Sequence, residues 1–188
     1  MSAWQQTIDR NLSEPSLVAL SLHVRYILDD KFSCLLHQDL GESCSNWERY
    51  LAQEGMHSLA PDKPGLYMFV WAPNSLSLQT DSKPLSFRVP IYIGKAEVSL
   101  QERFKSEYNS LLREAVPDAF WSAPEETSRK SRLKKYFALT PLEYWCCISD
   151  KPEVLPNLEG RLIRLFNPPA NKQKKLRAVA PPQKIWRM

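Results

Sequence analysis

The fold of this chain is decided by the stretch GLYMFVWAPNSLSLQTDSKPLSFRVPIYIGK, which runs from Gly65 to Lys95. It opens with Gly65-Leu66-Tyr67 and closes with Tyr92-Ile93-Gly94, so that each end carries a tyrosine and a glycine in one tripeptide. Residues 66–72 are rich in aromatic and branched side chains and are bounded by prolines, which predicts a strand. Residues 89–94 predict a second strand, in which Pro90 favours a place at the strand start or on an edge.

The side chains of a strand alternate between its two faces, and this alternation assigns the two tyrosines. The aliphatic residues of the predicted strands recur at every second position, namely Leu66, Met68, Val70, Val89, Ile91 and Ile93. If these aliphatic faces align, Tyr67 and Tyr92 lie together on the opposite face. Two core tyrosines would give the same pattern, and each would then need a partner for its hydroxyl.

A helix is predicted directly after the second strand. Ser99-Leu-Gln-Glu102 is a capping box, which places the helix start there. The buried stripe of this helix is expected to contain Leu100, Phe104, Leu111 and Leu112. Arg103 follows Leu100 by three positions, so it borders that stripe and is directed between helix and sheet rather than to the far face.

The last predicted helix spans residues 152–166 and carries one carboxylate beside its apolar stripe. The stripe contains Leu155, Leu158, Leu162 and Phe166, at helical spacing. Glu159 borders it, and a carboxylate there costs several kcal/mol unless it is paired or coordinates a metal. A salt bridge, for example to Arg103, and a metal site are the two interpretations.

The remaining elements complete an α+β pattern. Residues 13–30 and Ser45–Gln53 are predicted as helices, Ser128–Phe137 as a short basic helix and Leu142–Ile148 as a third strand. Residues 73–86 and 116–127 are predicted as loops, the first with an irregular hairpin as its alternative.

The charge is unevenly distributed along the 188 residues. Residues 1–60 are acidic, whereas residues 159–188 contain eight basic residues and one acidic residue. A basic end on an otherwise balanced chain favours contact with a polyanion, most simply nucleic acid. A solvated tail is the alternative, and charge alone does not choose between them.

The cysteines and the hydropathy pattern favour a soluble protein of the reducing cytoplasm. None of the four cysteines forms a C-x-x-C pair, and a zinc site from Cys34, His37 and Cys44 would lack a fourth ligand. No apolar run approaches the ~20 residues that cross a bilayer. The N-terminus lacks the basic and apolar regions of a signal peptide.

Taken together, these motifs resemble those of the GIY-YIG nuclease family, over residues 65–171. Gly65-Leu66-Tyr67 stands for the family's GIY, and Tyr92-Ile93-Gly94 is its YIG, followed by the common Lys95. Arg103 is placed like the family's helix arginine. The run EGRLIRLFNPPAN, from Glu159 to Asn171, is similar to its closing motif. Each tripeptide alone is weak evidence, but the ordered set is fairly specific.

The resemblance implies a fold and a domain division. The fold is α+β, a small three-stranded antiparallel sheet flanked by helices with a helical N-terminal extension. The extension would cover residues 1–60, the nuclease domain residues 61–172 and a basic tail residues 173–188. The segment between the two tyrosines is longer than in compact members, which favours the restriction-endonuclease-like branch. Glu107 stands where the family often has histidine or tyrosine, so that Tyr108 is one residue late.

The resemblance also implies an activity, a Mg²⁺-dependent DNA endonuclease leaving 5′-phosphate and 3′-hydroxyl ends, in restriction or phage defence. Mn²⁺ would substitute for Mg²⁺. Glu159 would hold the metal, and Arg103 would clamp a phosphate oxygen. The other implied catalytic residues are Tyr67, Tyr92, Lys95 and Tyr108. Tyr67 would orient or deprotonate the attacking water, and Lys95 would help to lower the pKa of Tyr67. Tyr92 would position the water or the scissile phosphate. The implied wall residues are Gly65, Gly94 and Asn171.

Two other functions remain open from the sequence. One is a structure-selective DNA repair nuclease, and the other is a catalytically silent nucleic-acid-binding module of the same fold. The expected nucleic-acid-binding residues are Arg129, Lys130, Lys134, Lys172, Lys174 and Lys175, with a solvated face as the alternative. Because one such site cuts one strand, double-strand cleavage would need a homodimer or two successive events.

Overall fold

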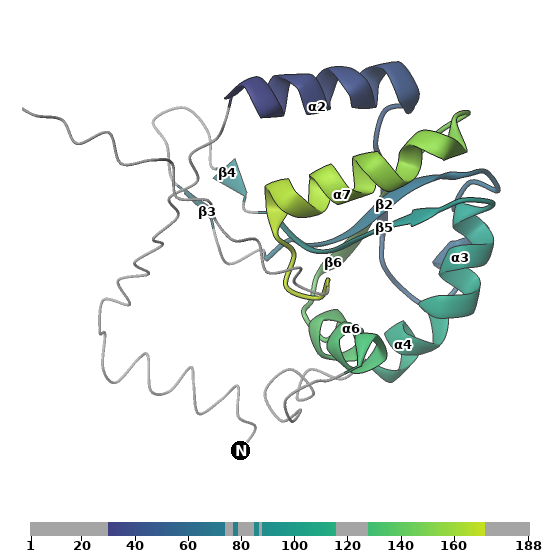
Figure 1. Cartoon of the computed structure of the whole chain (residues 1–188). Helices are drawn as coiled ribbons and strands as arrows, with labels where there is room; N and C mark the ends of the chain where they lie inside the picture. Colours follow the sequence, from purple (N-terminus) through teal and green to yellow (C-terminus); the bar gives the residue numbers. More distant parts are fainter. Residues whose placement is uncertain (1–29, 74–76, 79–84, 87, 116–127, 172–188) are drawn as a thin grey trace, which may run out of the picture.

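The computed structural model of the chain describes residues 30–73, 77–78, 85–86, 88–115 and 128–171 (Figure 1). The helices are α2 Asp30–Ser43, α3 Leu100–Glu107, α4 Asn109–Glu114, α6 Arg129–Phe137 and α7 Leu155–Phe166, with 3-10 turns at Met56–Ser58 and Pro152–Val154. The strands are β1 Glu48–Leu51, β2 Gly65–Trp71, β3 Ser77–Leu78, β4 Leu85–Ser86, β5 Val89–Ala96 and β6 Leu142–Ile148. The class is therefore α+β, as predicted.

The main sheet is antiparallel and has four strands, in the order β1-β6-β2-β5, rather than the three predicted. The extra strand is β1, in the segment that was predicted as a helix over Ser45–Gln53, and that prediction was wrong. The backbone of β1 pairs with β6, with Tyr50 opposite Tyr144. Pairing with β6 outweighed a local pattern too short to define a helix, because tertiary context overrides weak propensity.

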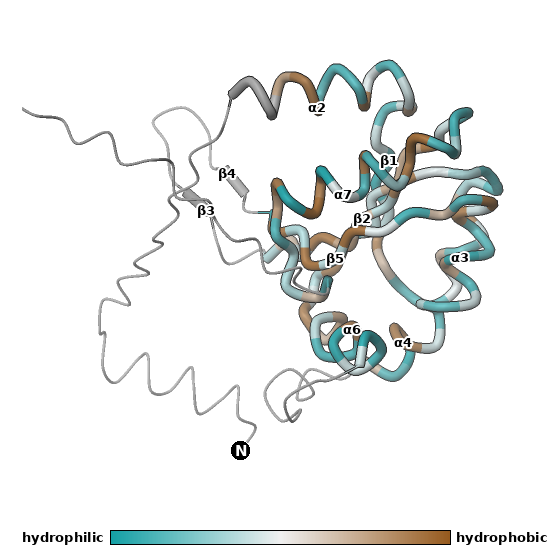
Figure 2. Tube along the Cα trace, viewed as in Figure 1, coloured by the Kyte–Doolittle hydropathy of each residue, from teal (hydrophilic) through white to brown (hydrophobic). Residues whose placement is uncertain are grey.

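Helices cover both faces of this sheet, α2 and α7 on one face and α3, α4 and α6 on the other (Figure 1). The core on the α7 side is mainly aliphatic and includes Leu66, Met68, Val70, Ile93, Leu155, Leu158 and Leu162. The core on the α3 side is mainly aromatic and includes Tyr67, Phe69, Tyr92, Phe104, Tyr108, Phe137 and Tyr144. The central strands between these layers are hydrophobic over much of their length (Figure 2). The two predicted tyrosines share the aromatic face.

The predicted alternation of the second strand fails before Tyr92, at Ile91 and Val89. The β2–β5 register pairs Phe69 with Tyr92 but Val70 with Pro90, so Ile91 is an extra residue on β5. Such a bulge shifts the side chains before it relative to those after it. As a result Ile91 packs in the aromatic core beside Tyr92, whereas Ile93 packs in the aliphatic core.

Several other predictions can be compared with the structure. The predicted helices at residues 99–112, 128–137 and 152–166 and the strand at 142–148 are confirmed, although the first divides into α3 and α4. Strands β3 and β4 pair as a short hairpin within the predicted loop 73–86. The helix predicted at residues 13–30 lies outside the described residues except for Asp30. The predicted loop 116–127 and the basic tail 173–188 lie entirely outside them. The division into domains stays a prediction. Among the described residues, no helix has the length and apolar character needed to cross a membrane.

Candidate active site

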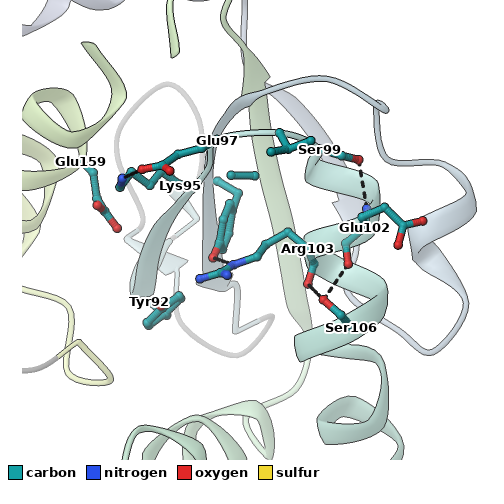
Figure 3. A pocket seen from close by; sticks show the side chains of 11 residues that line it. Tyr92, Lys95, Glu97, Ser99, Glu102, Arg103, Ser106 and Glu159 are labelled. Carbon is teal, nitrogen blue, oxygen red and sulfur yellow. Dashed lines mark hydrogen bonds and ion pairs between the residues drawn. The ribbon is translucent and has the colours of Figure 1, made fainter. Parts of the chain in front are cut away.

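A cavity of about 530 Å³ opens between β5, α3 and α7. Figure 3 shows the side chains around it, with Arg103 entering from α3 and Glu159 from the opposite wall. The residues that line it are Tyr67, Tyr92, Lys95, Ala96, Glu97, Val98, Ser99, Glu102, Arg103, Ser106 and Glu159. Five of the predicted catalytic residues therefore lie around one cavity, although they come from four separate elements.

Tyr67 lies at the back of this cavity and is completely buried. Its hydroxyl oxygen lies 2.5 Å from that of Tyr108, and Nε of Arg103 donates to it over 3.5 Å, a long hydrogen bond. The Tyr67 ring also stacks on Tyr144, with 5.7 Å between ring centroids. Tyr108, the predicted site residue that is one position late, therefore reaches the site from the C-terminal end of α3.

The two predicted wall glycines are places where the backbone is approached closely. Gly94 pairs with Tyr67 across β2 and β5, and a Cβ at Gly94 would overlap the Tyr67 hydroxyl, lying 2.5 Å from its Cζ. A Cβ at Gly65 would meet the carbonyl of Cys147 and lie 2.8 Å from a methyl group of Leu100. Glycine is required at both positions because no side chain fits.

Burial decides the protonation of Tyr67. Desolvation raises the pKa of its phenol well above the ordinary value of 10, and the hydrogen bonds from Arg103 and Tyr108 only partly oppose this rise. Tyr67 is therefore a neutral phenol at neutral pH. Lys95, which was expected to lower this pKa, forms an ion pair with Glu97 instead. The groups that lower the pKa of Tyr67 are Arg103 and Tyr108, on α3 and at its C-terminal end.

Glu107 lies between two arginines. It pairs with Arg103 one turn earlier on the same helix, and its second oxygen lies 2.7 Å from Nη2 of Arg129 on α6. The (i, i+4) pair with Arg103 could have been predicted from the sequence. The pair with Arg129 could not, because the approach of α6 is a property of the tertiary fold.

Arg129 is one of the expected nucleic-acid-binding residues, and that role stays a prediction. Its guanidinium turns toward the site, where Nε donates to the Tyr92 hydroxyl over 3.1 Å and Nη2 donates to the Tyr108 hydroxyl over 2.7 Å. No pattern in the residues predicts these contacts. Of the other predicted nucleic-acid-binding residues, Lys130 is exposed on α6, and Lys134 pairs with Glu114 at 3.2 Å. Residues 172, 174 and 175 lie outside the described part of the chain.

Glu159 is a half-buried carboxylate on α7 that faces the cavity (Figure 3). No hydrogen bond or ion pair joins it to any other residue that the structure describes, so the suggested salt bridge to Arg103 is not formed. Burial raises the pKa of its carboxyl group, while the positive charges of Lys95, Arg103 and Arg129 oppose that rise. A desolvated carboxylate that accepts no hydrogen bond from the described residues is a group that a cation would stabilise.

The donor set of the cavity fits a hard divalent ion better than zinc. Across the described ranges no three His, Cys, Asp or Glu side chains cluster around a common point, so Cys34, His37 and Cys44 do not form the zinc site considered above. The desolvated carboxylate of Glu159 beside this cavity suits Mg²⁺, because Mg²⁺ binds through one or two carboxylates and keeps several waters.

Asn171 closes the site at the edge of the sheet. Its side-chain amide donates to the carbonyl of Ile93 over 2.8 Å, and its carbonyl accepts from the amide of Ile93 over 2.9 Å. The neighbouring amide of Ala170 donates to the carbonyl of Ile91 over 2.9 Å. These bonds fix the segment after α7 against β5, the strand that carries Tyr92 and Lys95.

Comparisons with known proteins add a likeness to a solved structure. No protein-family profile matches the chain, and no curated protein matches it. The fold is similar to a crystal structure of the GIY-YIG N-terminal endonuclease domain of UvrC from Thermotoga maritima, bound to magnesium. The two are 24% identical, the match covers 62% of this chain and 91% of that chain, and the TM-score is 0.34. With so low a TM-score, no residue role is transferred from that domain.

Proposed function

We propose that this protein is a nuclease of the GIY-YIG type, which hydrolyses phosphodiester bonds in DNA with the help of a divalent cation. One observation carries the proposal. Tyr67, Tyr92, Lys95, Arg103 and Glu159 arise from four elements and line one cavity. They are the residues that the sequence motifs singled out, and together they provide phenols, cations and one carboxylate.

The charges of the cavity suit the hydrolysis of a phosphodiester. Negative charge develops on the phosphate oxygens in the transition state, and preorganised cations stabilise it. Arg103 is half-exposed and presents a rigid set of donors that matches a phosphate. Lys95 adds a second positive charge from β5, although it is paired with Glu97 until substrate arrives.

Glu159 would hold the divalent cation, for which its desolvated carboxylate is the suitable ligand among the cavity residues. When bound, the cation would stabilise the leaving oxygen and polarise the phosphate. Mg²⁺ is the first candidate, and Mn²⁺ is a substitute with similar ligand preference. Glu97 lies near enough to raise the pKa of the Glu159 carboxyl, so it adds to the negative field at this wall.

The tyrosines would position the attacking water. Tyr67 is neutral and lines the cavity, and its hydroxyl lies in contact with Arg103 and Tyr108. The water is then oriented by the phenol rather than deprotonated by a tyrosinate in the resting enzyme. Tyr92, which is 7% exposed, lies at the cavity wall and would hold the scissile phosphate or the water.

The direct test is cleavage of supercoiled plasmid by purified full-length protein in Mg²⁺, in Mn²⁺ and in EDTA. We expect nicking or linearisation that requires the cation, with 5′-phosphate and 3′-hydroxyl ends, and no cleavage by Glu159→Ala. Equal cleavage by Glu159→Ala, or none by the unaltered protein under any cation, would remove the proposal. DNA binding that weakens with salt but never leads to cleavage would identify a silent binding module instead.

The finer assignment, a restriction or defence enzyme that acts as a homodimer or by two successive cuts, is also a proposal. It predicts preferred cleavage of linear duplex at a defined sequence. A panel of linear, flapped and branched duplexes separates it from repair, because a structure-selective enzyme would cut the branched substrates first. Sedimentation of the protein with its substrate would determine whether two copies act together.

A further inference from the structure

One side chain, Arg129, joins the groups that surround Tyr67. It is the first residue of α6, where the side chain of Ser128 caps the helix by accepting from the amide of Ser131. Its guanidinium contacts Tyr92 on β5 and, on the α3 side, Tyr108 and Glu107. It also lies over the rings of both tyrosines, 5.4 and 5.8 Å from their centroids.

These contacts have a direction, because a guanidinium only donates. The Tyr108 oxygen accepts from Nη2 of Arg129 over 2.7 Å, so its own proton is available to another acceptor. The Tyr67 oxygen lies 2.5 Å away, and it also accepts from Arg103. In this arrangement the Tyr67 oxygen accepts two hydrogen bonds, and its own hydroxyl hydrogen remains available to donate to a group in the cavity.

Without Arg129 that direction is lost. Either hydroxyl of the Tyr67–Tyr108 pair is able to donate to the other, because each carries one proton and two lone pairs. If Tyr67 donated to Tyr108, its proton would be used inside the protein and would not reach a water in the cavity. The bond from Arg129 to Tyr108, at 2.7 Å, is much shorter than the bond from Arg103 to Tyr67, at 3.5 Å, so it polarises the Tyr108 hydroxyl more strongly and favours Tyr108 as the donor.

A lysine would not replace this arginine. The planar Arg129 guanidinium donates hydrogen bonds to two hydroxyls and forms an ion pair with one carboxylate, whereas an ammonium is a compact charge on a flexible stem. Glu107 fixes the guanidinium further, through the ion pair at 2.7 Å. The arrangement therefore depends on the geometry of arginine and not only on its charge.

We propose that Arg129 is a positioning residue of this site, which orients the Tyr108 hydroxyl so that it donates to Tyr67. This inference rests on the proposed nuclease function, because it assigns a residue to the same site. Arg129 acts through Tyr108 and Tyr67 and does not line the cavity itself, so its loss should slow the reaction more than it weakens substrate binding.

The first test does not need cleavage. In protein labelled with ¹³C at the tyrosine Cζ carbons, the Tyr67 signal is identified by its loss in Tyr67→Phe and reports the hydrogen bonding of the phenol. We expect Arg129→Gln and Tyr108→Phe each to shift that signal. Arg113→Gln, which removes the positive charge of an exposed arginine on α4, should leave the Tyr67 signal unshifted. An unmoved Tyr67 signal in folded Arg129→Gln overturns the proposal.

The second test measures kcat and KM separately. We expect Arg129→Gln to lower kcat about 10- to 100-fold at nearly constant KM, from the usual strength of a charged hydrogen bond. Tyr108→Phe should act similarly, and the double variant should be no slower than the slower single variant. Arg129→Lys should cleave nearly as slowly as Arg129→Gln, because the charge is kept but the geometry of the donors is lost. If Arg129→Gln does not fold, Arg129→Lys tests the same contacts.

The outcomes are distinct. Additive losses in the double variant, or a change in KM alone, would mean that Arg129 acts on the substrate, and would overturn the proposal. If the unaltered protein cleaves no nucleic acid, the proposed function fails, yet the Tyr67 signal still decides whether Arg129 orients Tyr108. If the unaltered protein cleaves and Arg129→Gln cleaves equally well, only the role of Arg129 is removed.

Discussion

The ring of Tyr67 lies across Gly94, its partner on the neighbouring strand, so closely that no side chain fits between them. The tyrosine of the first tripeptide and the glycine of the second are therefore one structural unit. This contact joins the two tripeptides across the strands β2 and β5, and it provides the first prediction.

Gly94→Ala should destabilise the protein and displace Tyr67. A methyl group there overlaps the tyrosine ring, and overpacking of this kind costs about 1–3 kcal/mol. Chemical denaturation would measure the loss, and the plasmid assay would show reduced cleavage. Gly160→Ala is the control, because nothing lies within 4 Å of a Cβ at Gly160 and alanine favours a helix. Equal stability of Gly94→Ala and the unaltered protein would contradict the close contact.

Glu159→Gln should stabilise the protein at neutral pH in the absence of divalent cations. Burial raises the pKa of this carboxyl above its unfolded value of 4.5, so the ionised form is penalised only in the folded state. The penalty is present above that value and disappears as the pH falls below it. The unfolding free energies of the two proteins should therefore differ at pH 7 and converge toward pH 4.

The same carboxylate predicts a response to metal. Mg²⁺ should raise the Tm of the unaltered protein and leave that of Glu159→Gln unchanged, because a ligand stabilises the state that binds it. Glu153→Gln, which removes an exposed carboxylate just before α7, should respond to Mg²⁺ like the unaltered protein. A rise of equal size in all three proteins would place the cation elsewhere.

Arg103→Lys should slow cleavage on the order of 100-fold, even though the charge is kept, because a preorganised donor to the phosphate is lost. Single-turnover rates at saturating Mg²⁺ would measure this effect. Arg113→Lys makes the same exchange at an exposed arginine of α4 and should leave the rate unchanged. A rate for Arg103→Lys within a factor of about two of the unaltered protein would show that charge alone is sufficient.

Asn171→Ala should release the segment after α7 from the sheet. Two hydrogen bonds to the backbone of Ile93 are removed, and each is worth about 1 kcal/mol. Hydrogen exchange at the Ile93 amide should accelerate, because that amide donates to Asn171. Asn157→Ala, an exposed asparagine of α7, is the comparison. Unchanged exchange at Ile93 would count against this closure.

The sequence could predict the parts of the site that follow from local periodicity. Strand alternation put Tyr67 and Tyr92 on one face, and helical spacing put Arg103 and Glu159 at the borders of their buried stripes. It failed at Ile91, because a bulge breaks the alternation without any mark in the residues themselves.

Other features depend on contacts between distant segments. Strand β1 exists because it pairs with β6, nearly a hundred residues further along the chain, and its own four residues gave no strand signal. The contacts of Arg129 depend on how α6 docks against α3 and β5. The opposing effects of burial and of nearby cations on Glu159 likewise arise only when β5, α3 and α7 meet around the cavity.

The bonds from Ala170 and Asn171 have a further consequence for self-association. Strand β5 is an outer strand of the sheet, and an outer strand exposes backbone groups on which another chain can add a strand. The carbonyl of Ile91 and both the amide and the carbonyl of Ile93 already form hydrogen bonds within the same molecule. Strand addition at this part of the β5 edge is therefore blocked, because another chain would have to displace Ala170 and Asn171 before it could pair there.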